Sequence, residues 1–180
     1  RYTMQNLNEI KNTFDLDQTK KFLRAIKGNK FECYFKLIMA YQISRMELVN
    51  IEWKDIDFEN STITIYPISQ KRNTRAYYSW NFKKKENLGR TFPLLPNLKN
   101  LLLDLRKQQE LNKLTNKNYD QTNENFICLK DDGTRLNINT LSRNLRYIAR
   151  DNDLPQILLS DLSNCLDSYV CQYADSYDFY

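Results

Sequence analysis

The stretch LVNIEWKDIDFENSTITI, residues 48–65, contains the point at which the hydrophobic pattern of the chain changes its period. Before it, apolar side chains recur at helical spacing from Phe31 to Tyr41, and a second helix is expected over Met46 to Ile51. After it, Asn60 and Ser61 predict a turn, and Thr62–Tyr66 alternates as a strand. The stretch therefore joins a helical region to a sheet.

Two further strands are expected after this one. They are RAYYSWNF, residues 75–82, and GRTFPL, residues 89–94, with the charged run KKKENLG between them as a hairpin tip. The sequence therefore predicts a small antiparallel sheet of about three strands.

Helices are expected on both sides of the sheet. Asp15 and Gln18 form a capping-box pattern at the start of the first helix, and Gly28 ends it. Three more helices are predicted over residues 95–114, 139–153 and 159–180. We expect a mostly α fold with a small antiparallel β-sheet (α+β), with residues 1–14 as an arm or linker and residues 15–180 as one domain.

The charge of the chain is unevenly distributed. Residues 151–180 hold six Asp and no Lys or Arg, which leaves 27 basic and 16 acidic side chains in residues 1–150. A basic body with an acidic tail favours a polyanionic partner. On charge alone, a solvated basic surface is an equal alternative.

Composition excludes several classes of site. The chain has no His, and its four Cys lack CxxC spacing, so we expect no zinc site, no disulfide framework and reduced thiols in the cytoplasm. No apolar run is long enough to predict a membrane span. We expect no metal and no small-molecule cofactor.

Three phrases together resemble the catalytic domain of the tyrosine recombinases, the phage-type integrases. They are residues 48–65, KKKENLGRTFPLLPNL (83–98) and FICLKDDGTRLNINTLSRNLRYIARDNDLPQILLSDLSN (126–164). The resemblance covers residues 15–175. It implies duplex DNA as the partner and leaves open whether other recombinase subunits bind as well. It also implies a tyrosine that attacks a DNA phosphodiester and leaves a 3′-phosphotyrosyl bond. Two arginines, a hairpin lysine and a histidine would surround that phosphate.

The first family arginine lies in a phrase like G-L-R-x-x-E-L. Here the phrase is QISRMEL, residues 42–48, so Ser44 stands at the arginine position and Arg45 is its neighbour. One helical step turns a side chain by about 100°, so Arg45 substitutes only if the backbone shifts. Lys84 stands at the hairpin lysine position.

The second catalytic box, H-D-L-R-H in the family, reads SDLSN here, residues 160–164. Ser160, Ser163 and Asn164 replace the His, the Arg and the second His. We expect these three residues to lie near Ser44 and within reach of Lys84. The family's nucleophilic tyrosine is expected beyond Tyr180, because the tyrosines at 169, 173 and 177 come too early and form an apolar stripe.

Basic residues retained elsewhere are candidates for phosphate contacts. Three of them are spaced to share one helical face. The candidates are Lys71, Arg72, Arg75, Lys83, Lys85, Arg90, Arg135 and the helical trio Arg143, Arg146 and Arg150.

Three interpretations follow. The first is a degenerate recombinase domain that binds DNA without cleaving it. The second is an active recombinase that uses Arg45 and a tyrosine outside this chain. The third is a relic that binds no DNA, or a protein-interaction module that acts through the acidic tail.

Overall fold

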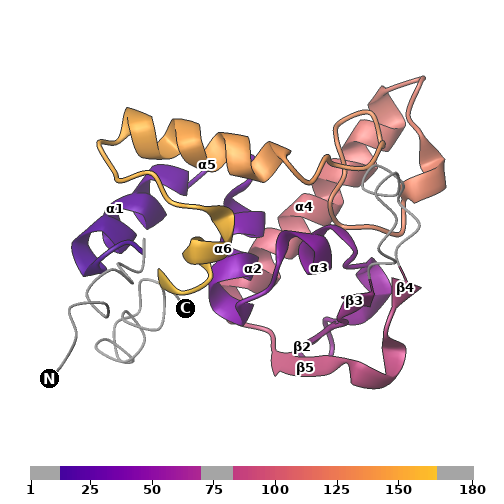
Figure 1. Ribbon diagram of the computed structural model, residues 1–180. Coiled ribbons are helices and arrows are strands. Elements are labelled where there is room, and N and C mark those ends of the chain that lie inside the picture. The colour runs from indigo at the N-terminus through magenta and orange to yellow at the C-terminus, as the bar shows by residue number, and fades with distance from the viewer. Residues whose placement is uncertain (1–12, 70–82, 166–180) are drawn as a thin grey trace, which may run out of the picture.

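The computed structural model describes residues 13–69 and 83–165, and the predicted α+β architecture is confirmed (Figure 1). Helices α1 and α5 lie at one side of the molecule and the strands at the other, with α2, α3 and α4 between them. The predicted strand over residues 75–82 lies outside the described residues, as does the predicted last helix from residue 166 onward.

Helix α1, Leu16–Ile26, begins where its capping signal predicts. Asp15 Oδ1 accepts from the Gln18 backbone N–H at 2.8 Å, and the Asp15 N–H donates to Gln18 Oε1 at 2.9 Å. Gly28, with φ +75°, follows the C-cap. Phe14 is 2% exposed and packs on the Phe22 ring, so this residue belongs to the core rather than to the predicted arm.

Helix α2, Glu32–Tyr41, forms the centre of the core. All but one of its residues are buried, and it packs against α3, Arg45–Val49, and α4, Pro96–Thr115. The Tyr41 hydroxyl donates to the Pro93 carbonyl at 2.9 Å and accepts from the Leu95 N–H at 3.3 Å, which ties α2 to the start of α4.

The turn between α2 and α3 places Gln42 in the left-handed region, with φ +51°. Gln42 stands where the family phrase has Gly. Glycine adopts this conformation without steric cost, whereas a residue with a side chain, such as Gln42, adopts it less readily.

The larger sheet has the order β1-β2-β5, all antiparallel, with β1 at Ile56–Asp57, β2 at Thr62–Ile65 and β5 at Arg90–Pro93. Ile63 and Ile65 point into the core, as the alternation predicts. Strand β1 was not expected, because two residues are too short for a periodic signal.

A second sheet pairs β3, Ile68–Ser69, with β4, Lys83–Lys84. The prediction that these lysines lie at a hairpin tip is therefore wrong. Pro67 separates β3 from β2, because proline has no N–H for the strand ladder. The 3₁₀ helix Glu86–Leu88 occupies the turn instead.

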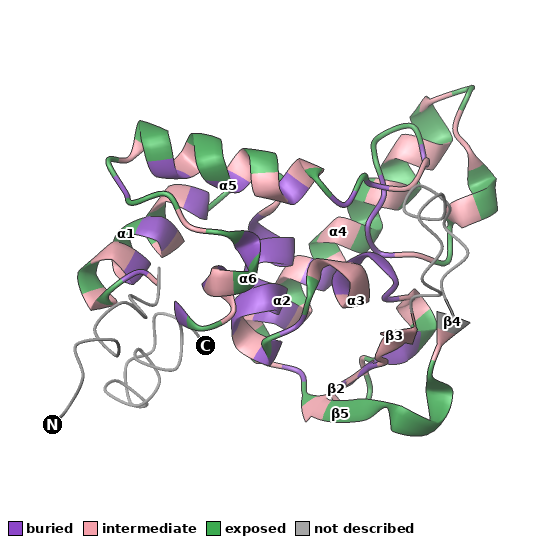
Figure 2. Cartoon of the chain, in the orientation of Figure 1, coloured by how far each residue is buried: buried purple, intermediate pink, exposed green. Residues whose placement is uncertain are grey.

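Three shorter elements complete the description: the 3₁₀ helices Trp53–Asp55 and Gln121–Asn123, and α6, Leu159–Leu162. Helix α5, Thr140–Asp151, buries one stripe against α1 and exposes the other (Figure 2). Among the described residues, no helix combines the length and the apolar character that crossing a membrane requires.

Candidate functional site

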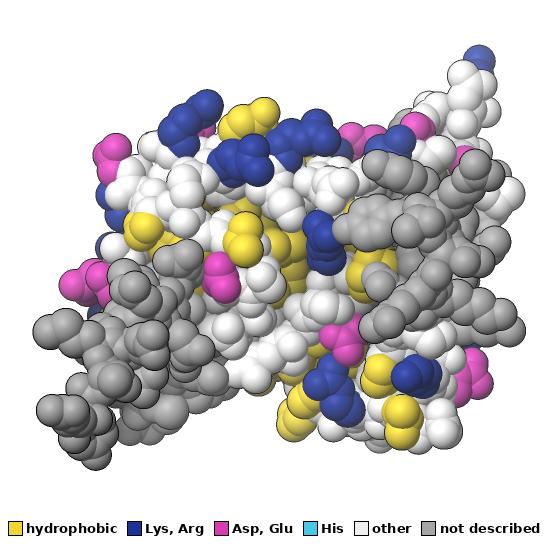
Figure 3. Space-filling model, in the orientation of Figure 1, with side chains coloured by type: hydrophobic (Ala, Val, Ile, Leu, Met, Phe, Trp, Pro, Cys, Tyr) yellow, Lys and Arg dark blue, Asp and Glu magenta, His cyan; other side chains and the backbone are white. Residues whose placement is uncertain are grey.

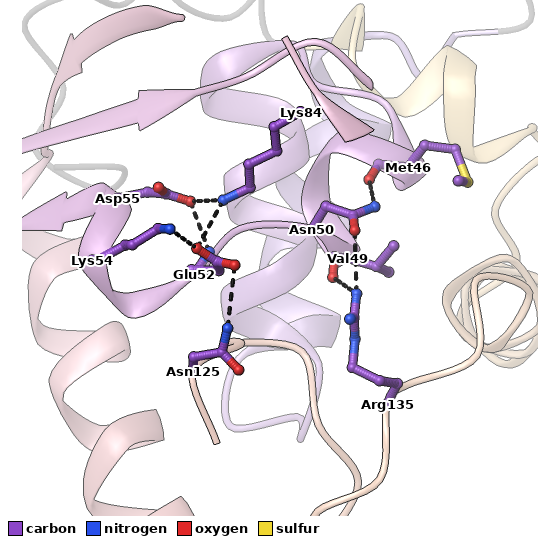
Figure 4. A network of polar contacts seen from close by, with 9 residues as sticks. All are labelled: Met46, Val49, Asn50, Glu52, Lys54, Asp55, Lys84, Asn125 and Arg135. Carbon is purple, nitrogen blue, oxygen red and sulfur yellow. Dashed lines mark hydrogen bonds and ion pairs between the residues drawn. The ribbon is translucent and has the colours of Figure 1, made fainter. Parts of the chain in front are cut away.

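Lys84 on β4 lies in a cluster of charged side chains (Figure 4). Its Nζ is 2.6 Å from Asp55 Oδ2 and 3.3 Å from Glu52 Oε2. The Lys84 side chain is 14% exposed and that of Asp55 is 4% exposed. The short distances and low exposure mean that the lysine charge is matched inside the protein.

Glu52 is the shared member of this cluster. Its Oε2 is also 2.8 Å from Lys54 Nζ, and its Oε1 accepts from Asn125 Nδ2 at 3.2 Å. Burial alone would raise the pKa of Glu52, but the hydrogen bond from Lys54 and the charge of Lys84 hold that pKa below its ordinary value. Glu52 is therefore a carboxylate at neutral pH.

Arg135 lies beside this cluster and turns inward (Figure 4). Its Nη2 donates to the Val49 carbonyl at 2.6 Å and to Asn50 Oδ1 at 3.3 Å, and its guanidinium lies 3.4 Å from the centre of the Phe126 ring. Burial lowers the pKa of Arg135, the largest of the effects on it. Arg135 therefore joins the loop after Phe126 to the end of α3.

Ser44, which the resemblance predicts to stand at the position of the first catalytic arginine, is the N-cap of α3. Its hydroxyl accepts from the Glu47 N–H at 3.1 Å, and its own N–H donates to Glu47 Oε2 at 2.8 Å. The same carboxylate, through Oε1, is 2.9 Å from Arg90 Nη2. Arg45 is directed toward α5, where its Nη1 donates to Asn139 Oδ1 at 3.0 Å.

The SDLSN box forms α6 and the turn that follows it. Ser163 Oγ donates to the Ser160 carbonyl at 2.7 Å, and Asp161 Oδ2 accepts from the Leu158 N–H at 3.1 Å. Ser160 and Asn164 are exposed, while Ser163 is half-buried. The box therefore offers hydroxyl and amide groups, together with one carboxylate.

The exposed face of α5 carries the basic trio. Arg143 and Arg146 are exposed, and no ion pair involves either of them within residues 13–69 and 83–165. Arg150 pairs with the adjacent Asp151 at 2.8 Å but remains mostly exposed. Figure 3 shows Lys and Arg side chains gathered along the edge of the molecule over α5.

Comparisons with known proteins agree with this architecture. No protein-family model matches the chain. A curated "Tyrosine recombinase XerC-like" protein of Caldanaerobacter subterraneus subsp. tengcongensis is 28% identical over 109 residues, which is 57% of this chain and 28% of that protein.

Solved structures match over almost the whole chain. The Tn1549 transposon integrase in complex with transposon right end DNA gives a TM-score of 0.69 at 16% identity, covering 96% of this chain and 57% of that one. The XerH recombinase bound to its difH substrate gives 0.63 at 18% identity, covering 98% and 46%. The XerA recombinase gives 0.62 at 13% identity, covering 93% and 53%.

This chain has the fold of a tyrosine recombinase catalytic domain. The resemblance predicted from the sequence is thereby confirmed for the fold. The recombinase-like chain spans about half the length of the structures it matches and 28% of the length of the curated relative.

Not all of the predicted DNA contacts of the recombinase-like domain are surface cations. Arg135 is half-buried and its guanidinium donates to the Val49 carbonyl and to Asn50 Oδ1, so it is not among the proposed contacts. Arg90 is paired with Glu47, while Lys85 is exposed beside β4. The side chain of Lys83 and residues 71, 72 and 75 lie outside the described structure.

The predicted active-site positions are also distributed between elements. Lys84 lies beside Asp55 and Glu52, Ser44 lies at the start of α3, and the SDLSN box lies on α6. The closeness of that box to Ser44 stays a prediction. Among the described residues, no group of three or more Asp, Glu or Cys could hold a metal ion.

Sequence reasoning missed the partners of Ser44 and Lys84 in this region, which are Glu47, Glu52 and Asp55. Ser44 and Glu47 carry the S-x-x-E pattern of a capping box, which would have predicted that Ser44 is an N-cap. Glu52 and Asp55 have no comparable signal, because their pairing with Lys84 depends on the tertiary fold.

Proposed function

We propose that this chain is a tyrosine-recombinase-like domain that binds duplex DNA and does not cleave it. The observation that carries the proposal is the absence of cations where the family holds the phosphate. Ser44, Ser160, Ser163 and Asn164 occupy those positions, and the remaining cation, Lys84, is already paired with two carboxylates.

Negative charge builds up on the phosphate in the transition state of DNA cleavage and must be stabilised by fixed donors. Loss of one preorganised donor typically slows such a reaction by about a hundred- to a thousandfold. Two arginine positions and two histidine positions are replaced together. Lys84 would have to leave Asp55, 2.6 Å away, to protonate a leaving oxygen.

The DNA-binding part of the proposal is supported by α5. Arg143, Arg146 and Arg150 project from one exposed helix face of a chain whose first 150 residues are strongly basic. The Tn1549 integrase and XerH structures with the same fold are complexes with DNA. Exposed arginines on one face of a helix suit contacts with the phosphate backbone.

The test for binding compares two variants of equal charge. Arg143→Gln with Arg146→Gln removes two cations from α5, and Lys107→Gln with Lys130→Gln removes two exposed cations elsewhere. Log affinity falls with log salt, and we expect the α5 variant to make that negative slope shallower by about 0.9 for each lost phosphate contact. The control variant should leave that slope unchanged.

The test for cleavage uses the full-length gene product, because the alternative of an active recombinase places the nucleophilic tyrosine outside this chain. A pool of random duplexes is incubated with that protein, and the bound fraction is separated on a denaturing gel. We expect free DNA strands only. A covalent protein–DNA adduct would overturn the inactive assignment in favour of a recombinase that uses Arg45, and absence of binding at low salt would favour a relic or a protein-interaction module.

A further inference from the structure

A basic hollow lies between α1, α2 and the first turn of α4. It has a volume of about 520 Å³, within the usual range for ligand pockets. Its lining has four basic side chains and one acidic side chain. The lining residues are Lys20, Leu23, Arg24, Lys27, Glu32, Lys36 and Asn97.

Helix α1 supplies most of the positive charge. Lys20, Arg24 and Lys27 are spaced by four and three residues, so they extend along one face from the middle of α1 to its C-cap. Arg24 and Lys27 are exposed, and Leu23 contributes apolar surface between them.

The single carboxylate in the lining is already neutralised. Glu32 Oε1 is 2.7 Å from Lys36 Nζ, and both side chains are only 10% exposed. Glu32 Oε2 accepts from the Gly28 N–H at 2.7 Å. Both carboxylate oxygens therefore have partners, and the charges of the α1 residues outweigh the acidic group.

The lining of the hollow comes from α1, α2 and α4 and includes no residue of α5, so the hollow does not share residues with the basic trio. We propose that this hollow binds phosphate groups. Several cations around one concave space favour a multiply charged anion over a single carboxylate, and the Arg24 guanidinium can donate two parallel hydrogen bonds to a phosphate.

Two sources could supply this phosphate chemistry. One is a free oligophosphate, which the volume of the hollow can accommodate. The other is the backbone of a DNA segment that passes over α1. The residues that line this hollow lie outside the predicted recombinase active-site positions and outside α5.

Arg24 and Lys27 could instead serve only the helix itself. Cations at the end of a helix interact favourably with the negative end of its dipole. That role would change the stability of the protein without changing its affinity for an anion. A variant that lacks both cations therefore separates the two roles: loss of the dipole role lowers stability, and loss of the binding role lowers anion affinity.

The experiment titrates the chain with inorganic triphosphate at low salt by calorimetry. The test variant is Arg24→Gln with Lys27→Gln, and Lys107→Gln with Lys130→Gln is the control of equal charge. Lys20 is left unchanged because it takes part in another interaction, and Lys36 because it is buried. We expect the test variant to bind triphosphate at least tenfold more weakly, with the control within twofold of the unchanged protein.

Urea denaturation of the same variants separates anion binding from a dipole effect. A lower unfolding midpoint with unchanged triphosphate affinity would overturn the proposal. Equal weakening by the test and control variants, or no triphosphate binding by the unchanged protein, would overturn it as well.

A duplex titration then identifies the source of the phosphate. If the test variant also lowers the salt slope for duplex, and triphosphate competes with duplex, the hollow takes phosphates of the DNA backbone. If triphosphate binding falls while duplex binding stays the same, it takes a free oligophosphate. The triphosphate titration still tests the hollow even if the α5 face binds no DNA, because it does not depend on duplex binding.

Discussion

Lys84 Nζ lies 2.6 Å from Asp55 Oδ2, and this contact connects the second sheet to the 3₁₀ helix that precedes the first. Lys84, which the resemblance predicts to be the lysine that faces DNA, is therefore also a structural residue. A phosphate approaching Lys84 competes with a carboxylate that is almost completely buried.

Asp55→Asn tests this competition. The neutral amide removes the charge opposite Lys84, although Glu52 remains 3.3 Å away. We expect a loss of about 1–3 kcal/mol in the free energy of unfolding, since Lys84 keeps one partner. Duplex affinity should rise at the same time, because Lys84 becomes available to phosphate. A fall in affinity for the folded variant would contradict this explanation.

Glu52 predicts a specific dependence of stability on pH. Its pKa is lowered in the folded protein, so its contribution is complete above its ordinary pKa of 4.5 and is lost as pH falls through the lower folded value. We expect Glu52→Gln to be less stable than the unchanged protein at pH 7, with the difference narrowing toward pH 3. Urea denaturation at both pH values measures the stability difference between the two proteins. A difference that stays constant with pH would exclude the lowered pKa of Glu52 as its cause.

Arg135→Gln separates an internal role from a DNA contact. The substitution weakens the hydrogen bond to the Val49 carbonyl and removes the guanidinium from the Phe126 ring. We expect the free energy of unfolding to fall by about 1–3 kcal/mol. The salt slope of duplex binding should not change, and a slope reduced by about one would restore Arg135 to the DNA contacts.

The catalytic positions can be tested by restoring the cations of the family. Ser44→Arg with Ser160→His and Ser163→Arg should raise duplex affinity at matched salt, because the site gains charge around a phosphate. The same variant should lose about 1 kcal/mol of stability, since Ser44 no longer caps α3.

The double variant Ser160→His with Ser163→Arg, which keeps the cap, is the control for that loss. Affinity equal to that of the unchanged protein, for both variants, would show that α6 does not face DNA.

Local signals in the sequence account for the parts of the fold that could be predicted. The box of Asp15 and Gln18 fixes the start of α1, and the alternation in Thr62–Ile65 fixes the buried side of β2. Both depend on residues close together in the chain. Strand β1 and the position of Lys83–Lys84 in a strand were not predictable in this way, because each depends on a partner strand.

The candidate site was less predictable than the fold for the same reason. Sequence position identified Lys84, but its partner Asp55 lies 29 residues away and is brought close only by packing. In the sequence Arg135 has the pattern of a surface residue in a polar turn. Only the folded structure shows that its guanidinium donates a hydrogen bond to the Val49 carbonyl. The capping role of Ser44 was not predicted either, although its partner Glu47 lies only three residues away and completes a recognisable S-x-x-E pattern.

The packing of α1 against α5 has a consequence for synthesis. These helices are separated by more than a hundred residues, so α1 leaves the ribosome well before α5, one of the elements that cover it, has been made. Contacts of such long sequence separation slow folding. Phe22 can meet Phe14 and Phe35 early, because both are made soon after or before it, but the side of α1 that α5 covers stays open to chaperones until translation passes residue 151.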